Sequence, residues 1–148
     1  MKRIRFLFAL ISLVSGCGFT EKEIMDSEDA DVYIPIDHDY NEVSEWSITW
    51  ESIFEMESDN YYVYFYSMSC NHCTEIKNYM IEKCLERGDI YFVKGTSKDQ
   101  LTKDQNKLIG AEKPEDFYIL GYPSLAQIHN KKCTKNVAGI SQIKQELN

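Results

Sequence analysis

An apolar run that ends in a Cys-x-x-Cys motif constrains this chain more than any other feature. The run Tyr61–Ser67 is rich in aromatic residues, and Cys70 and Cys73 follow it closely. A helical pattern begins directly behind the cysteines, which predicts that the first sulfur lies at a helix N-terminus. There the unpaired N–H groups and the helix dipole favour a thiolate over a thiol. The second sulfur, one turn further on, could close a disulfide with the first, so the motif predicts thiol–disulfide exchange.

The N-terminus has the pattern of an export signal. Three basic residues precede an apolar run at 6–14, which is about half the roughly 20 residues that a membrane span needs. The run ends in Val-Ser-Gly-Cys17 and resembles the lipobox of bacterial lipoproteins. The resemblance implies that residues 1–16 are a lipoprotein signal peptide and that Cys17 is the lipidated first residue of the mature protein. An ordinary signal peptide with a coincidental cysteine is the alternative.

Export would place the mature chain at the extracytoplasmic face of the cell membrane, where disulfides persist. Loss of the three basic residues of the signal leaves 13 of the 16 basic residues against 24 acidic ones, a formal charge of −11. Such a charge argues against nucleic acid as a partner and against electrostatic binding to anionic lipid, so attachment is expected through the lipid on Cys17. Residues 17–45 carry many acidic side chains and are predicted as an extended acidic tether.

The rest of the chain, residues 46–148, is long enough for one domain and alternates between helical and strand patterns. Helices are expected at about 49–57, from the cysteines to about Arg87, and from about Ser141; strands are expected at 61–67, 90–93, 124–129 and 132–138. Gly88 is expected to end the helix that follows the cysteines. The polar stretch 96–115 fits either a helix or a long loop.

This order of elements resembles the thioredoxin superfamily. The resemblance rests on the Cys70/Cys73 pair at a strand–helix junction, the stretch 117–123 ending in Gly-Tyr-Pro, the turn at Asn130-Lys131-Lys132, and the closing segment 139–147. It implies an α/β fold with a central mixed sheet flanked by helices and a polar insert before a cis-proline. It also implies that Pro123 is the cis residue and that Tyr122 faces the substrate through its backbone. An ordinary turn proline is the alternative.

The predicted chemistry gives each residue of the motif a role. Cys70 attacks a client disulfide to form a mixed disulfide, and Cys73 resolves it; in reverse, the oxidised pair accepts electrons from a client dithiol. Oxidising members of the superfamily often carry a histidine where His72 stands, whereas thioredoxin has proline. The resemblance therefore predicts that His72 tunes the pair to be more oxidising than thioredoxin. The alternatives are a histidine with little electrostatic effect and, for the pair, a structural disulfide.

Two positions depart from the superfamily pattern. Directly before the nucleophile, thioredoxin has tryptophan and this chain has Ser69. Six residues before the nucleophile, thioredoxin has a buried aspartate that assists proton transfer, and this chain has Tyr64. A phenol is a poor proton acceptor near neutral pH. The sequence leaves open whether Glu75 or water deprotonates Cys73.

Two further cysteines lie outside the motif. Cys84 is three helical turns beyond Cys73, about 16 Å away, which is too far for a disulfide between them. We expect Cys84 to be a small buried residue, and Cys133 to be either its disulfide partner or a free surface thiol. A zinc site is disfavoured, because Cys84, Cys133 and the histidines provide no second closely spaced pair of ligands.

These observations predict a lipid-anchored thiol–disulfide oxidoreductase that acts on dithiols or disulfides of exported proteins and is reset by a redox partner. The sequence has no Gly-rich phosphate loop and no haem-binding Cys-x-x-Cys-His motif, so no cofactor is expected. The alternative is a thioredoxin-fold accessory or binding module that docks another exported protein and whose cysteine pair is not catalytic.

Overall fold

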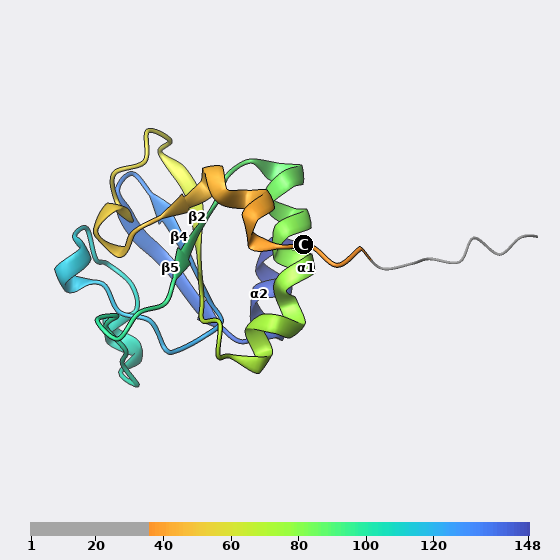
Figure 1. The fold of residues 1–148 in the computed structure, drawn as a ribbon. Helices are drawn as coiled ribbons and strands as arrows, with labels where there is room; N and C mark the ends of the chain where they lie inside the picture. The colour runs from red at the N-terminus through yellow and green to blue at the C-terminus, as the bar shows by residue number, and fades with distance from the viewer. Residues whose placement is uncertain (1–35) are drawn as a thin grey trace, which may run out of the picture. The chain divides into compact units, whose positions relative to one another are not determined.

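A computed structural model describes residues 36–148; the predictions for the signal peptide and for Cys17 lie outside these residues. The described residues contain one five-stranded sheet in the order β1-β3-β2-β4-β5 (Figure 1). Its strands are β1 (Ser47–Ile48), β2 (Asn60–Tyr66), β3 (Ile90–Lys94), β4 (Ser124–His129) and β5 (Lys132–Ala138). The helices are α1 (Asn71–Arg87) and α2 (Ile140–Leu147), with short 3-10 helices η1 (Tyr40–Trp46), η2 (Trp50–Ser52), η3 (Gln105–Lys107) and η4 (Pro114–Asp116).

The sheet is mixed, as the resemblance implied. Strands β1 and β2 both run parallel to β3, while β4 runs antiparallel to β2 and to β5. Helix α1 is the crossover between the parallel strands β2 and β3, and the β4–β5 hairpin turns at Asn130 and Lys131, which have positive φ angles. The predicted thioredoxin-like fold is confirmed by this strand order.

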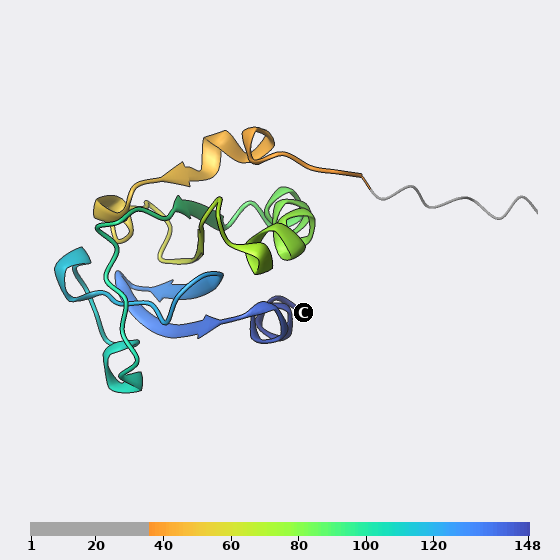
Figure 2. The ribbon, with the colours of Figure 1, turned by 60° about the horizontal axis from the view of Figure 1, so that its bottom comes forward.

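Strand β2 lies in the middle of the sheet and is buried on both faces. Successive side chains of a strand point to opposite faces, so its residues divide between two cores. Tyr62, Tyr64 and Tyr66 pack with α1, α2 and η1. Tyr61, Val63 and Phe65 pack on the other face with residues of η2, its flanking turn and the segment before β4. Figure 2 shows the two α-helices on one side of the molecule and the 96–116 segment on the other.

Helix α1 is defined at both ends by its sequence. Its N-cap is Cys70, whose side chain accepts the Cys73 N–H, and its C-cap is Gly88, which has the left-handed φ of 69° that glycine adopts without steric cost. Its buried face repeats at three- and four-residue steps through Cys73, Ile76, Met80 and Cys84, and Ile81 is buried beside them. Within residues 36–148, no helix has both the length and the apolarity needed to cross a bilayer.

Part of the predicted tether belongs to the folded domain, so its predicted end at residue 45 is wrong. Residues 40–46 form η1, with Asp39 as its N-cap, and Val43 is completely buried. Tyr40, Val43 and Trp46 pack against the core under α1. Their three-residue spacing matches the 3-10 helix, and the acidic residues between them concealed this apolar stripe.

The predicted helix at 49–57 is also wrong, because the segment contains only the short η2 and a turn. Ile53 and Phe54 pack into the second core, and the Trp50 indole N–H donates to the Pro114 carbonyl at 3.3 Å. These long-range contacts outweigh the local helical pattern. The polar stretch 96–115 is largely loop with two 3-10 turns, tied down by a bridge between Leu101 and Ile119.

Candidate active site

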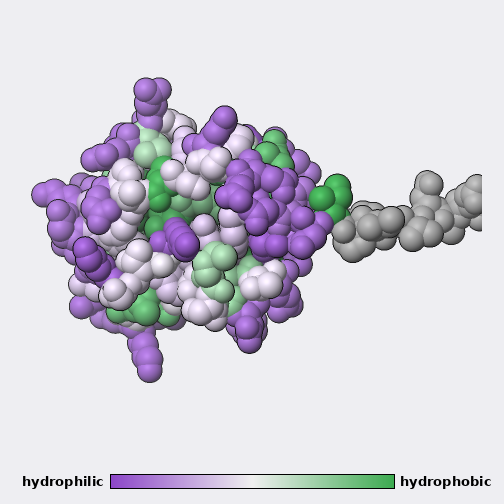
Figure 3. Space-filling view, viewed as in Figure 1, coloured by the Kyte–Doolittle hydropathy of each residue, from purple (hydrophilic) through white to green (hydrophobic). Residues whose placement is uncertain are grey.

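The first sulfur of the motif lies at the carboxyl end of the central strand. After β2 ends at Tyr66, three residues lead to Cys70, which is half-buried and caps α1. Ligands of open α/β sheets bind at this edge, where parallel strands end. The surface visible in Figure 3 is mostly hydrophilic with small apolar patches. Met68, two residues before Cys70, is a large apolar side chain that is 66% exposed.

The Cys70 sulfur has two polar neighbours of opposite effect. Its Sγ accepts the backbone N–H of Cys73 at 3.1 Å, the bond that caps the helix. Its S–H donates to the backbone carbonyl of Tyr122 at 3.5 Å. The N–H and the positive end of the helix dipole favour a thiolate, whereas the carbonyl favours a thiol. The position of Tyr122 therefore bears directly on the reactivity of this sulfur.

The second sulfur is hidden from solvent. Cys73 is only 1% exposed, and it packs in the core beneath the first turn of α1. Burial, and secondly a hydrogen bond with Cys70, raise the pKa of the Cys73 thiol to about 12. The predicted roles of Cys70 as the attacking thiol and Cys73 as the resolving thiol require an accessible sulfur beside a buried one, and these roles remain a prediction.

Tyr122 approaches Cys70 through its backbone carbonyl, and its side chain contacts Asp99 and Gly95. The Tyr122–Pro123 peptide bond is cis, as the resemblance implied. The Tyr122 hydroxyl donates to the carboxylate of Asp99, and the ring packs over Gly95. Burial and Asp99 both raise the pKa of Tyr122. Sequence reasoning missed Asp99 and Gly95, because each lies more than twenty residues from Tyr122 in a stretch without a clear pattern.

His72 lies on the outer face of α1. Its ring is 74% exposed, and Nδ1 lies 3.6 Å from Glu75 Oε2. Glu75 stands two residues beyond Cys73, and side chains at that spacing point to opposite sides of a helix. The exposed Glu75 carboxylate therefore faces His72 and solvent, which is unfavourable for its proposed role as the base that deprotonates Cys73.

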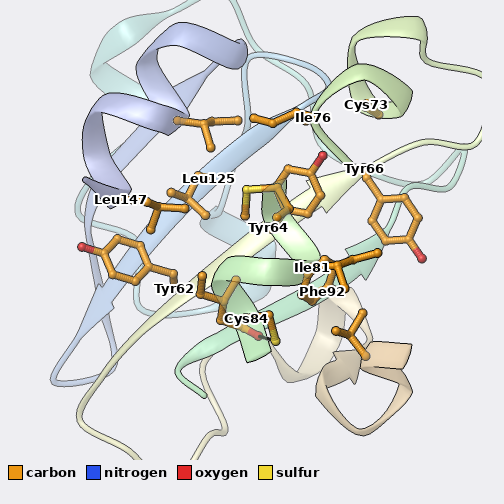
Figure 4. Packing of buried hydrophobic residues seen from close by; sticks show 14 residues of the cluster. Tyr62, Tyr64, Tyr66, Cys73, Ile76, Ile81, Cys84, Phe92, Leu125 and Leu147 are labelled. Carbon is orange, nitrogen blue, oxygen red and sulfur yellow. Dashed lines mark hydrogen bonds between the residues drawn. The ribbon is translucent and has the colours of Figure 1, made fainter. Parts of the chain in front are cut away.

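Tyr64 is completely buried in the core that contains Cys73. Figure 4 shows its hydroxyl pointing toward the turn of α1 that carries Cys73. Burial, and secondly the Tyr40 phenol, raise the pKa of Tyr64, so this phenol stays protonated. Among residues 36–148, the buried hydroxyls of Tyr64 and Tyr40 find no hydrogen-bond partner. The Tyr40 ring stacks on Tyr66 at 3.9 Å, a contact that could not be predicted while residues 17–45 were assigned to a tether.

Cys84 and Cys133 lie in separate cores on opposite faces of the sheet, so a disulfide between them is ruled out. Cys84 is buried, as predicted. The prediction of Cys133 as a surface thiol is wrong: it is 1% exposed, because backbone hydrogen bonds to Gly110 and Ala111 lay the insert along the edge of β5. Within residues 36–148, no three His, Cys, Asp or Glu side chains converge as a metal site.

A pocket of about 540 Å³ opens at the same edge of the sheet as the cysteines. It shares Gly95 and Asp99 with the Tyr122 contact, and Trp50, Lys94 and Lys98 are among its other lining residues. Its lining combines indole, lysine and carboxylate groups and does not include the two cysteines.

No family model matches the sequence, and no curated protein matches it. Several solved structures resemble the chain, and each of the following covers 68% of it. Thioredoxin f2 of Chlamydomonas reinhardtii is 18% identical over 88% of its own length, with a TM-score of 0.44. Plasmodium falciparum thioredoxin is 15% identical over 94%, with a TM-score of 0.45, and spinach chloroplast thioredoxin f is 12% identical over 78%, with a TM-score of 0.46.

These likenesses are too distant to support residue roles, so the assignment rests on the structure itself. The strand order, the cysteine pair at the start of α1 and the cis-proline opposite it define a thioredoxin-like domain.

Proposed function

We propose that this protein is a membrane-anchored thiol–disulfide oxidoreductase that exchanges disulfides with exported proteins through Cys70 and Cys73. The observation that carries the proposal is the environment of Cys70 Sγ. This half-buried sulfur accepts an N–H at the start of α1 and lies 3.5 Å from the Tyr122 carbonyl. An accessible sulfur at a helix N-terminus can act as a nucleophile, and the Tyr122 carbonyl beside it is a backbone group that an extended client can pair with.

The exchange balances without a cofactor. The Cys70 thiolate attacks one sulfur of a client disulfide, and the other client sulfur leaves as a thiolate. Cys73 loses its proton and attacks Cys70, which releases the reduced client and forms the Cys70–Cys73 disulfide. Two electrons pass to the client, and a separate redox partner must return the pair to the dithiol. In the opposite direction the oxidised pair takes two electrons from a client dithiol.

Substitution of each cysteine tests the catalytic part of the proposal. We expect Cys70→Ser to abolish reduction of a peptide disulfide, and Cys73→Ser to accumulate a mixed disulfide with the peptide, visible by mass spectrometry. Cys84→Ala is a matched control from the same helix that should keep the activity. If the Cys70 and Cys73 variants retain full biological function, the protein is instead a binding module with a non-catalytic pair.

Membrane anchoring is the second part of the proposal, and the lipobox-like sequence supports it. Lipid on Cys17 would attach the chain to the extracytoplasmic face of the membrane. The acidic tether, residues 18–35, would separate it from the domain, which contacts α1 from Ile36 onwards. In a bacterial host we expect wild type to incorporate labelled palmitate and to fractionate with membranes. Cys17→Ser should lose both properties. Equal labelling of the two proteins would refute the anchor.

The third part is that the pair is more oxidising than thioredoxin, whose potential is about −270 mV. The support is the His72 residue between the two cysteines. An imidazolium at this position stabilises the reduced thiolate form, although the neighbouring Glu75 carboxylate offsets part of its charge. We expect a potential clearly above that of thioredoxin and a lower one for His72→Pro. A wild-type potential near −270 mV would contradict this part alone.

A further inference from the structure

We infer that Asp99 is a positioning residue for the active-site sulfur, acting through the Tyr122 side chain. The inference rests on the proposed function, because it concerns the same thiol. It gives the polar insert, residues 96–115, a role in positioning Tyr122 that the sequence alone did not predict. A chain of contacts leads from the insert to Cys70.

The first contact fixes the Tyr122 phenol. Its hydroxyl donates to Asp99 Oδ2, and its ring lies flat against Gly95. A Cβ atom at Gly95 would lie 2.5 Å from the ring carbon Cζ, so a side chain larger than glycine would displace the ring. The phenol also touches both hydrophobic cores. These contacts hold the Tyr122 side chain in one position.

The second set of contacts fixes Asp99. Its other carboxylate oxygen, Oδ1, accepts the Thr96 hydroxyl at 2.7 Å, so both oxygens have a donor. The turn begins at Gly95, whose N–H donates to the Tyr66 carbonyl at 2.6 Å, where β2 ends. The carboxylate is thereby anchored to the carboxyl ends of the two central parallel strands, β2 and β3.

The third contact reaches the sulfur. With its side chain held by Asp99, Tyr122 presents its carbonyl to Cys70 Sγ at 3.5 Å. A carbonyl at this distance accepts from the thiol and opposes the thiolate, so it partly offsets the effect of the helix N-terminus. Asp99 therefore acts on Cys70 without touching it. When the hydroxyl–carboxylate bond is lost, the carbonyl is free to move away, and Cys70 ionises more readily.

A double-mutant cycle tests this inference through the pH dependence of Cys70 alkylation by iodoacetamide. Tyr122→Phe removes the hydroxyl and keeps the ring, and Asp99→Ala removes the acceptor. Each is expected to move the alkylation profile to lower pH, with about a threefold faster reaction at pH 7, equivalent to half a pH unit. The double variant should equal either single variant, because both remove the same bond. Asp104→Ala, in the same insert, is the control and should leave the profile unchanged.

Two results overturn the inference: an unchanged profile in both single variants, or additive shifts in the double variant. If Asp99→Ala fails to fold, Asp99→Asn serves in its place, and it should shift the profile less because it retains an acceptor for the hydroxyl. Alkylation needs no client, so the result is independent of the proposed function. A protein that exchanges no disulfide but shows the coupled shift would refute the function and retain the Asp99 contact.

Discussion

The two faces of the sheet are covered in different ways. One face lies under the regular helices α1 and α2 together with η1, and its core includes Cys73 and three tyrosines of β2. The other face lies, within residues 36–148, under short 3-10 turns and the irregular insert, and its core is built around Phe65 and Phe117. Both faces exclude water from the same strand, although they share little secondary structure.

The helix face supplies the two sulfurs of the motif. The irregular face holds Tyr122, whose carbonyl lies beside Cys70 Sγ. A helix N-terminus can be specified by a few adjacent residues, because its N–H groups and dipole are local properties. The carbonyl that opposes it belongs to Tyr122, whose position depends on contacts with Gly95 and Asp99 in the other layer. The reactive thiol therefore lies where the two layers meet.

The largest expected effect tests whether the irregular face is as well packed as the helix face. Phe117 is fully buried, and its ring lies 5.3 to 5.8 Å from those of Trp50, Phe54 and Phe65. Phe117→Ala should lower the free energy of unfolding by about 3–5 kcal/mol, measured by urea denaturation. Ile109→Ala in the same insert is the control; its side chain is exposed, so the change should stay within about 0.5 kcal/mol. A Phe117→Ala cost below about 1 kcal/mol would show a loosely attached layer.

An intermediate effect is expected on the stability in alkaline solution, where one buried thiol from each face of the sheet can be compared. Burial raises the pKa of both Cys84 and Cys133 to about 12. Because the folded state keeps these protons longer than the unfolded state, the stabilising contribution is complete below about pH 9 and is lost as the pH rises toward 12. Cys84→Ala and Cys133→Ala should each flatten this decline by about 1.4 kcal/mol per pH unit.

Urea unfolding between pH 8 and 11 measures the decline. Met80→Ala is the matched control, since it leaves a cavity without removing a titrating group and should lower stability equally at every pH. If one cysteine variant keeps the full alkaline slope, its thiol is more exposed to solvent than the structure shows.

The smallest effect concerns the η1 segment that completes the helix face. Asp39→Ala removes the N-cap of η1 and should cost about 1 kcal/mol. A hydrogen bond from the Asp39 backbone N–H, and secondly one from His38, lowers the pKa of Glu42. The stability that the ionised Glu42 contributes is present above the usual carboxyl pKa, and it is lost as the pH falls through the lowered pKa of Glu42. Glu42→Gln should therefore weaken the acid dependence of unfolding, whereas Glu45→Gln should retain it.

Prediction from sequence succeeded where the relevant interactions are close along the chain. The Tyr61–Ser67 strand, the cap at Cys70 and the stop at Gly88 each depend on a few neighbouring residues, and all three were found where expected. The resemblance to thioredoxins correctly implied the mixed sheet and the cis bond before Pro123. The prediction for residues 36–45 failed because average acidity outweighed two apolar residues, Tyr40 and Val43, whose partner surface is formed elsewhere in the chain.

The sequence by itself therefore determined the position of the reactive sulfur, because periodicity and helix capping act over a few residues. Tertiary structure alone decided which groups surround that sulfur and which thiols are buried from solvent. Asp99 meets Tyr122 across 23 positions, and the insert buries Cys133 by pairing with the edge of β5. Contacts of this kind form only when distant segments pack against one sheet, and no local pattern of residues records them.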